Sequence, residues 1–205
     1  MILSFFKQAC ANYSRYGLTT LMTQANNPDM FLIPDPSALL TTLSDQTYIG
    51  AYVPHNLVLM SDIHRLKYAM YLNNDAYDAL KKMIDAMPDE IANDFYVKEA
   101  YTSFTDLQYS NPNLAGKDER QLGHTVSIAS KSIAYQEFET SALSQWLEAH
   151  SYEYGFILRY PKRMASSTNH VYDAHYYRYV GKKNANKIYK ENSCIEEYNQ
   201  KEAAE

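Results

Sequence analysis

Segments with the hydrophobic period of a helix and segments with the alternation of a strand follow one another in an irregular order along this chain. Apolar residues recur at helical spacing over about residues 75–87 and 141–150, and a further helical pattern begins near residue 184. Alternating apolar, β-branched and aromatic residues predict strands at about residues 95–101, 124–130, 156–160 and 171–180. Because strands and helices do not alternate regularly along the chain, the order predicts an α+β domain.

The first 45 residues carry a weaker pattern. Asn27-Pro28 and Pro34-Asp35-Pro36 interrupt it, so we expect short helices joined by turns. With 205 residues, of which 46% are hydrophobic, the chain is long enough to bury one sizeable core. We therefore expect an N-terminal extension, residues 1–45, that packs on a single domain formed by residues 46–205.

Charge and hydropathy exclude several classes of partner. The formal net charge is -5 and no block of like charges stands out, so nucleic acid is not an expected partner. The apolar run within Met1–Lys7 is too short for the core of a signal peptide. Nowhere does the chain approach the roughly 20 consecutive apolar residues that a transmembrane helix needs. We expect neither a visible leader nor a membrane-spanning segment.

The two cysteines, Cys10 and Cys194, lie near opposite ends of the chain. They are compatible with one disulfide in an oxidising compartment, which their spacing does not establish. The alternative is that Cys194 is a small buried apolar residue.

Several segments, in the same order along the chain, are similar to those of one protein family. The most specific is Trp146–Lys162, with the sequence WLEAHSYEYGFILRYPK. Weaker blocks are Tyr52–Val58, Ala76–Met83, Ala100–Phe104, Arg178–Gly181 and Ile195–Tyr198. Over about residues 47–198 the chain resembles the VanY-like D-alanyl-D-alanine carboxypeptidases, zinc peptidases that trim the stem peptide of bacterial peptidoglycan. The resemblance implies a small central antiparallel sheet with flanking helices.

The resemblance also implies a specific chemistry. In that family a Ser-x-His-x-x-Gly-x-x-x-Asp motif supplies a His and an Asp to one zinc ion. A Glu-x-x-His motif supplies the third ligand, and its Glu is the base for the attacking water. Three protein ligands with one open position let zinc lower the pKa of bound water to about 7. The loss of two ligands is therefore expected to abolish the metal site.

This chain departs from both motifs. In the first motif His124 is retained, whereas Ser127 stands at the Gly and Lys131 at the Asp. In the second motif Asp173 aligns with the catalytic Glu and Tyr176 with the metal-binding His. The resemblance thus leaves His124 as the one retained ligand and makes Asp173 a shortened, inactive counterpart of the base.

A lysine at a metal position disfavours the metal. An ammonium about 4 Å from a divalent ion is repelled by roughly 8 kcal/mol at an effective dielectric constant of about 20. We therefore expect that Lys131 pairs with Asp173 where the zinc would lie, with His124 and Tyr176 hydrogen-bonding around them. His175 is a weaker candidate as a substitute ligand. It needs a β-bulge to reach the face of Tyr176, because adjacent strand residues point to opposite faces.

A binding groove is the remaining site that the resemblance implies. Its expected members are Thr102, Ser103, Lys131, Arg159, Tyr176 and Arg178. Thr102 replaces the arginine with which the family grips a substrate carboxylate. Arg159 and Arg178 would anchor an acidic group, or alternatively they pair with carboxylates of the chain itself.

Three functions follow from these observations. The first is a VanY-like domain without zinc or any other cofactor, a pseudoenzyme that serves as a structural module or binds a peptidoglycan stem peptide, another cell-wall fragment or another peptide. The second is an active zinc D,D-carboxypeptidase with a rearranged site, and the third is a partner-binding protein that uses residues 1–45. The family resemblance implies a bacterial, extracytoplasmic location; the oligomeric state is not predicted.

Overall fold

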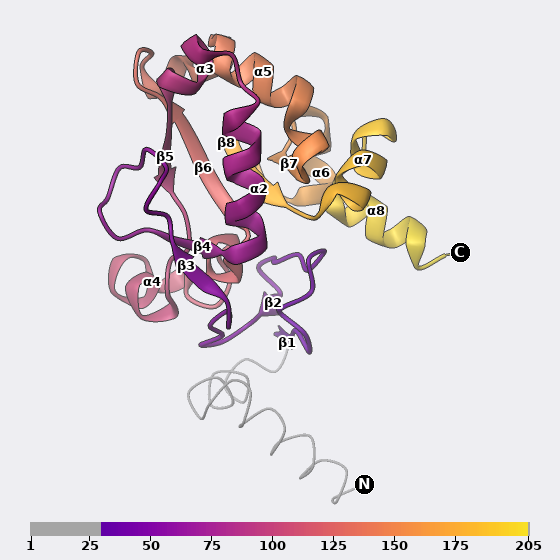
Figure 1. Cartoon of the computed structure of the whole chain (residues 1–205). Coiled ribbons are helices and arrows are strands. Elements are labelled where there is room, and N and C mark those ends of the chain that lie inside the picture. The colour runs from indigo at the N-terminus through magenta and orange to yellow at the C-terminus, as the bar shows by residue number, and fades with distance from the viewer. Residues whose placement is uncertain (1–29, 205) are drawn as a thin grey trace, which may run out of the picture. The chain divides into compact units, whose positions relative to one another are not determined.

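A four-stranded antiparallel sheet lies at the centre of the fold (Figure 1). Its strand order is β5 (Phe95–Glu99), β6 (Thr125–Ser130), β8 (Asp173–Tyr179) and β7 (Phe156–Tyr160). Every neighbouring pair is antiparallel, with register shifts within β5 and near the end of β7. The four strands are those that the sequence predicts, and the expected α+β fold with a small antiparallel sheet is confirmed.

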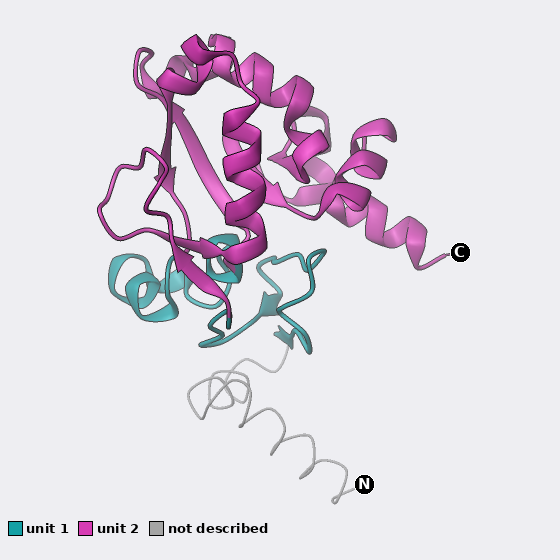
Figure 2. Ribbon diagram, in the orientation of Figure 1, with its two compact units in different colours: residues 1–55, 102–122 teal, residues 56–101, 123–205 magenta. Residues whose placement is uncertain are grey.

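The computed structural model describes residues 30–204 and divides them into two compact units (Figure 2). Unit 1 comprises the described residues up to His55 together with Thr102–Leu122. Unit 2 comprises Asn56–Tyr101 and the described residues from Gly123 onward, and it contains the central sheet. Among the residues described, no helix has the length and apolar character that crossing a membrane requires.

The longest helix of unit 2 is α2 (Asn74–Asp85). Its N-cap is Asn73, whose side chain accepts hydrogen bonds from the Asp75 and Ala76 N–H groups at 3.0 and 3.4 Å. The apolar stripe that predicts this helix is buried. With residues of β5, β6, β8 and α5 (Ala142–His150), it forms the core of the unit.

The remaining helices of unit 2 are short. They are α3 (Asp89–Asp94), α6 (Ala165–Thr168), α7 (Lys182–Lys190) and α8 (Ile195–Glu202), with 3-10 turns η3 (Tyr135–Thr140), η4 (Ser151–Tyr154) and η5 (Lys162–Met164). Ser141 caps α5 through its hydroxyl, which accepts from the Ser144 N–H at 3.0 Å. Gly155 follows η4 with a φ of +91°. A Cβ there would lie 2.8 Å from the Tyr179 ring, so this turn requires glycine.

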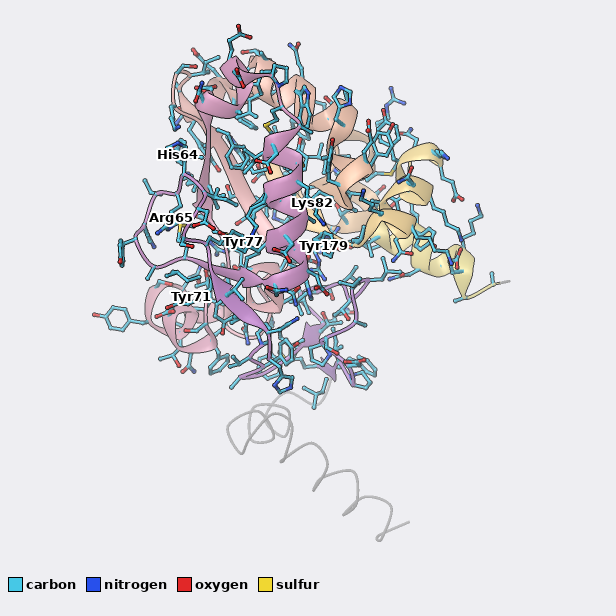
Figure 3. All side chains as sticks on the ribbon, in the orientation of Figure 1. His64, Arg65, Tyr71, Tyr77, Lys82 and Tyr179 are labelled. Carbon is cyan, nitrogen blue, oxygen red and sulfur yellow. The ribbon has the colours of Figure 1, made fainter. Side chains whose placement is uncertain are left out.

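A hairpin of β3 (Leu57–Leu59) and β4 (Tyr71–Asn73) completes unit 2. The loop between these strands runs alongside β5, where Arg65 forms a parallel bridge with Val97. The Arg65 guanidinium holds the loop together by donating to the carbonyl oxygens of Ser61, Ile63 and Tyr68. Figure 3 shows Arg65 on this loop beside β5, and Tyr77 on α2.

Unit 1 has a small core of its own. It contains the parallel pair β1 (Phe31–Leu32) and β2 (Thr47–Tyr48), the helix α4 (Phe104–Ser110), and the 3-10 turns η1 (Pro112–Leu114) and η2 (Glu119–Leu122). The buried Gln121 side chain connects its segments: it donates to the Gly50 and Tyr52 carbonyls and accepts from the Gly116 N–H.

The N-terminal extension differs from its prediction where the structure describes it. Residues 30–45 form β1 and turns, with no helix among them, whereas short helices were expected. The reason is local, because Pro34 and Pro36 remove backbone donors and disfavour helical geometry in the residues before them. Residues 1–29 and Cys10 lie outside the described residues. The boundary after residue 45 stays a prediction, and the compact units do not divide there.

Candidate functional site

Three side chains form a row across the central sheet on one face. Ser127 of β6 is paired with Glu99 of β5 on one side and with Tyr176 of β8 on the other. Residues directly opposite each other in antiparallel strands project from the same face of the sheet. The Tyr176 hydroxyl donates a hydrogen bond to Glu99 Oε2 at 3.1 Å, so the row is joined above Ser127.

Ser127 lies beneath this hydrogen bond and is fully buried. Its hydroxyl makes no hydrogen bond to any described residue, although buried hydroxyls normally have a partner. Glu99 is the member of the row that sequence reasoning missed. The alternation of the strand at 95–101 indicates which residues share a face, but it does not give the register that brings Glu99 to Tyr176.

Lys131 does not pair with Asp173, and the expected ion pair is wrong. Its ammonium donates instead to the Asn93 carbonyl oxygen at 2.6 Å, and no ion pair joins Lys131 to Asp173 among the described residues. The reason lies in the turn after β6, where the Lys131 N–H donates to the Asp94 carbonyl at 2.9 Å. This contact directs the exposed Lys131 toward the junction of α3 and β5.

The Asp94 side chain fixes the same turn. It accepts from the Ser130 hydroxyl at 2.6 Å and from the Ser132 N–H at 2.8 Å. Burial alone would raise the pKa of Asp94, but the hydrogen bonds from Ser130, Ser132 and Lys131 together hold this pKa below its ordinary value. A charged carboxylate thus stabilises the turn that carries Lys131 away from the row.

Asp173 uses its carboxylate locally. Oδ1 accepts from the His175 N–H at 2.9 Å, the contact of an Asx turn at the start of β8. The neighbouring pairing of Asp173 with Tyr160 lies at the register shift between β7 and β8. Asp173 therefore shapes the entry to its strand.

His175 does not fit the role of a substitute metal ligand. Its Nδ1 lies 2.7 Å from the Ile128 carbonyl oxygen and its Nε2 lies 3.0 Å from that of Tyr135. The ring is buried and stacks on Tyr135 and Phe138, with centroids 3.6 and 4.3 Å apart. Carbonyl oxygens therefore occupy the directions from which a metal would approach either nitrogen.

A zinc ion does not fit the residues of this face. His124 is buried just before β6, and its backbone carbonyl accepts from the Tyr179 N–H at 2.8 Å. Over residues 30–204 no three His, Cys, Asp or Glu side chains come close enough together to hold a metal ion. Zinc peptidases need three protein ligands, and the acidic and imidazole donors do not converge here.

The two arginines of the expected groove are internal. Arg159 is 1% exposed, and its two terminal nitrogens donate to Glu196 Oε1 and Oε2 at 2.6 and 3.1 Å. This bidentate pair connects β7 to α8, as the alternative of pairing within the chain predicts. Arg178 is fully buried in β8 between Thr125 and Ile157. Both guanidinium groups are almost completely buried, and a role for them in a binding groove stays a prediction.

Thr102 and Ser103 lie in unit 1, apart from the unit that contains the sheet. The Ser103 hydroxyl accepts from the Asp106 N–H at 3.1 Å and donates to Asp106 Oδ2 at 2.6 Å. Ser103 therefore caps α4. A role of these two residues in ligand binding stays a prediction.

Comparison with known proteins finds similarity to one family. The model of the VanY family, D-alanyl-D-alanine carboxypeptidase, matches residues 105–182. YodJ of Bacillus subtilis (strain 168) is 29% identical over 191 residues, which are 82% of this chain and 70% of YodJ. The D-alanyl-D-alanine carboxypeptidase of Enterococcus faecalis (strain ATCC 700802 / V583) is 34% identical over 60% of this chain, which spans only 44% of that relative.

Solved structures share the fold. The LdcB LD-carboxypeptidase superposes with a TM-score of 0.75 at 27% identity, over 83% of this chain and 90% of LdcB. VanYB, solved in complex with D-alanine-D-alanine, gives a TM-score of 0.62 at 24% identity, over 79% of this chain and 97% of that structure. The family model, these relatives and the shared fold together support the resemblance of this chain to the VanY-like D-alanyl-D-alanine carboxypeptidases.

Proposed function

We propose that this chain is a VanY-like domain without peptidase activity that serves as a binding module for a peptide of the kind its relatives recognise. The observation that carries the proposal is the hydrogen bond from Tyr176 to Glu99. At the position that aligns with the family's metal-binding histidine, the Tyr176 phenol instead donates to a carboxylate on the edge strand β5, across the intervening strand β6.

The other substitutions support the same proposal. The ammonium of Lys131 stands at the position of the second metal ligand and bonds the Asn93 carbonyl, and Asp173 caps the start of β8. The repulsion expected between Lys131 and a metal is therefore not what opposes zinc here. A shortage of ligands opposes zinc instead, because zinc needs three protein donors and His124 supplies only one imidazole.

Peptide binding is supported by the relatives. VanYB binds D-alanine-D-alanine, and the fold of this chain covers most of that structure. Loss of the metal removes the means to activate water, but it does not remove the backbone and aromatic surfaces that hold a peptide.

Zinc content and turnover test the proposal directly. Purified protein equilibrated with zinc and then desalted is expected to retain no stoichiometric metal by elemental analysis. It is also expected to release no D-Ala from a pentapeptide that ends in D-Ala-D-Ala. Stoichiometric zinc together with turnover that a chelator abolishes would overturn the proposal in favour of an active peptidase.

A reversion provides the complementary experiment. The double variant Lys131→Asp, Tyr176→His restores the ligand types of the family's motifs and removes the ammonium that bonds the Asn93 carbonyl, so it is expected to bind zinc that the wild type does not. The matched control pairs Lys131→Asp with Tyr179→His, because Tyr179 projects from the opposite face of β8. Equal zinc binding by the two double variants would show that the row is not the remnant of the metal site.

A further inference from the structure

A cleft in unit 2 lies along the outer edge of the sheet and has no role assigned so far. Its volume is about 630 Å³, within the usual range for ligand sites. β7, the turn that follows it and the end of α7 contribute to the lining, and Figure 1 shows β7 and α7 side by side. None of His124, Lys131, Asp173 and Tyr176 lines it, so it is distinct from the row across the sheet.

The backbone of β7 offers hydrogen-bonding groups to this cleft. β7 is an edge strand that pairs with β8. The Gly155 carbonyl accepts from the Val180 N–H at 2.9 Å, which fixes the alternation of the ladder. In that alternation Leu158 stands opposite Tyr177 in a non-hydrogen-bonded pair, so its N–H and C=O point away from β8. Leu158 is partly exposed and lines the cleft. An extended peptide can pair with these two groups.

Aromatic rings form the walls. The rings of Tyr152 and Tyr189 stack with centroids 3.8 Å apart, and Tyr189 is 47% exposed. Across the cleft lies the half-buried Tyr172. Burial and then the nearby carboxylates of Glu139 and Glu148 raise the pKa of Tyr172 to about 12, so its phenol stays a neutral hydrogen-bond donor. Such walls suit the apolar and amide surfaces of a peptide.

The charges of the cleft favour an anionic ligand. Lys162 is paired with Glu139. Arg163, Lys190 and Glu148 also line the cleft, and none of the three has an ion-pair partner among residues 30–204. Two unpaired cations against one unpaired carboxylate leave the cleft locally positive, although the whole chain has a formal net charge of -5.

We infer that this cleft binds a short extended peptide with a free carboxylate, whose backbone pairs with Leu158 and whose carboxylate contacts Arg163 and Lys190. The inference rests on the proposed function and assigns the peptide to a site at the β7 edge. The face of the sheet that carries the row of Glu99, Ser127 and Tyr176 is then not the main binding surface.

The test uses the full chain and two forms of one probe. The probe is an N-acetylated tetrapeptide that ends in D-Ala-D-Ala, prepared with a free carboxylate and as the C-terminal amide, and binding is measured by calorimetry. The variant Arg163→Gln, Lys190→Gln is expected to weaken binding of the free acid by about tenfold or more, because two charge-assisted contacts are lost. Binding of the amide is expected to change little.

Two single variants sharpen the test. Lys183→Gln removes an exposed cation from α7 outside the cleft, and it is expected to leave binding unchanged. Glu148→Gln removes the unpaired carboxylate of the cleft, and it is expected to tighten binding of the free acid by a few-fold. Far-ultraviolet circular dichroism and unfolding midpoints verify that each variant is folded.

The measurements separate a failure of the proposed cleft from a failure of the proposed binding function. If the wild type binds the peptide and the Arg163→Gln, Lys190→Gln variant binds it equally well, the cleft is wrong and the proposed binding function stands. If Tyr176→Phe weakens binding in that case, the peptide lies over the row formed by Glu99, Ser127 and Tyr176. If the wild type binds neither form of the probe, the proposed function fails and this inference fails with it.

Discussion

Tyr176 and Glu99 are joined by a hydrogen bond across the intervening strand β6, with 3.1 Å between the phenol oxygen and Glu99 Oε2. The two residues come from distant segments and meet because both are paired with Ser127. This contact joins three strands on one face of the sheet, and under the proposed function it stands where the relatives hold a metal ion.

Removal of the phenol is therefore expected to cost stability. In Tyr176→Phe, Glu99 loses a donor to a partly buried carboxylate, and hydrogen bonds to charged groups contribute about 1.5–3 kcal/mol. Urea unfolding should show a loss of free energy in or slightly below that range. Tyr109→Phe is the control, because Tyr109 is 94% exposed. An equal stability of Tyr176→Phe and wild type would contradict the assigned contact.

The pair formed by Arg159 and Glu196 is expected to be the most sensitive ion pair of unit 2. Glu196→Gln leaves a guanidinium that is 1% exposed without its charged partner, and breaking a buried pair costs about 3–5 kcal/mol. The control Glu202→Gln breaks the exposed pair with Lys187, which is expected to cost less than about 1 kcal/mol. Thermal and urea unfolding of both variants check the contrast, and equal losses would rule out a special role for Arg159.

Asp94 gives a prediction about acid stability. Its pKa is lowered in the folded state, so its contribution is present above the ordinary value of about 3.8 and is lost as the pH falls through the lower folded value. Asp94→Asn is expected to be less stable than wild type at pH 7, and the difference should shrink toward pH 3. Urea unfolding at both pH values measures it, with Asp89→Asn on the neighbouring helix turn as control. A difference that does not depend on pH would exclude the charged carboxylate as its source.

His175 is expected to anchor the segment after β6 to the sheet. Its two ring nitrogens lie against the carbonyls of Ile128 and Tyr135, and its ring stacks on Tyr135. His175→Leu should lose the hydrogen bond from the ring nitrogen that carries the hydrogen and cost about 1–3 kcal/mol, because one carbonyl loses its donor. Hydrogen exchange should rise mainly over residues 131–140. An exchange pattern raised uniformly across the sheet would argue against a local anchor.

The sequence predicts the four strands of the central sheet because the alternation that indicates a strand is a pattern of neighbouring residues. Alternation over 156–160 and 171–180 is a property of neighbouring residues, and the strands that form there agree with it. The short pairs β1–β2 and β3–β4 are not predicted, because two or three residues are too few to establish a period.

The resemblance read from the sequence predicts which residues stand at the family's functional positions, with His124 retained and Lys131, Asp173 and Tyr176 as replacements. The contacts of these side chains depend on the tertiary structure. Cross-strand register brings Glu99 to Tyr176, and the turn held by Asp94 directs Lys131 to the Asn93 carbonyl rather than to Asp173. Register and turn geometry arise from contacts between distant segments, so the residue pattern of a single strand does not contain them.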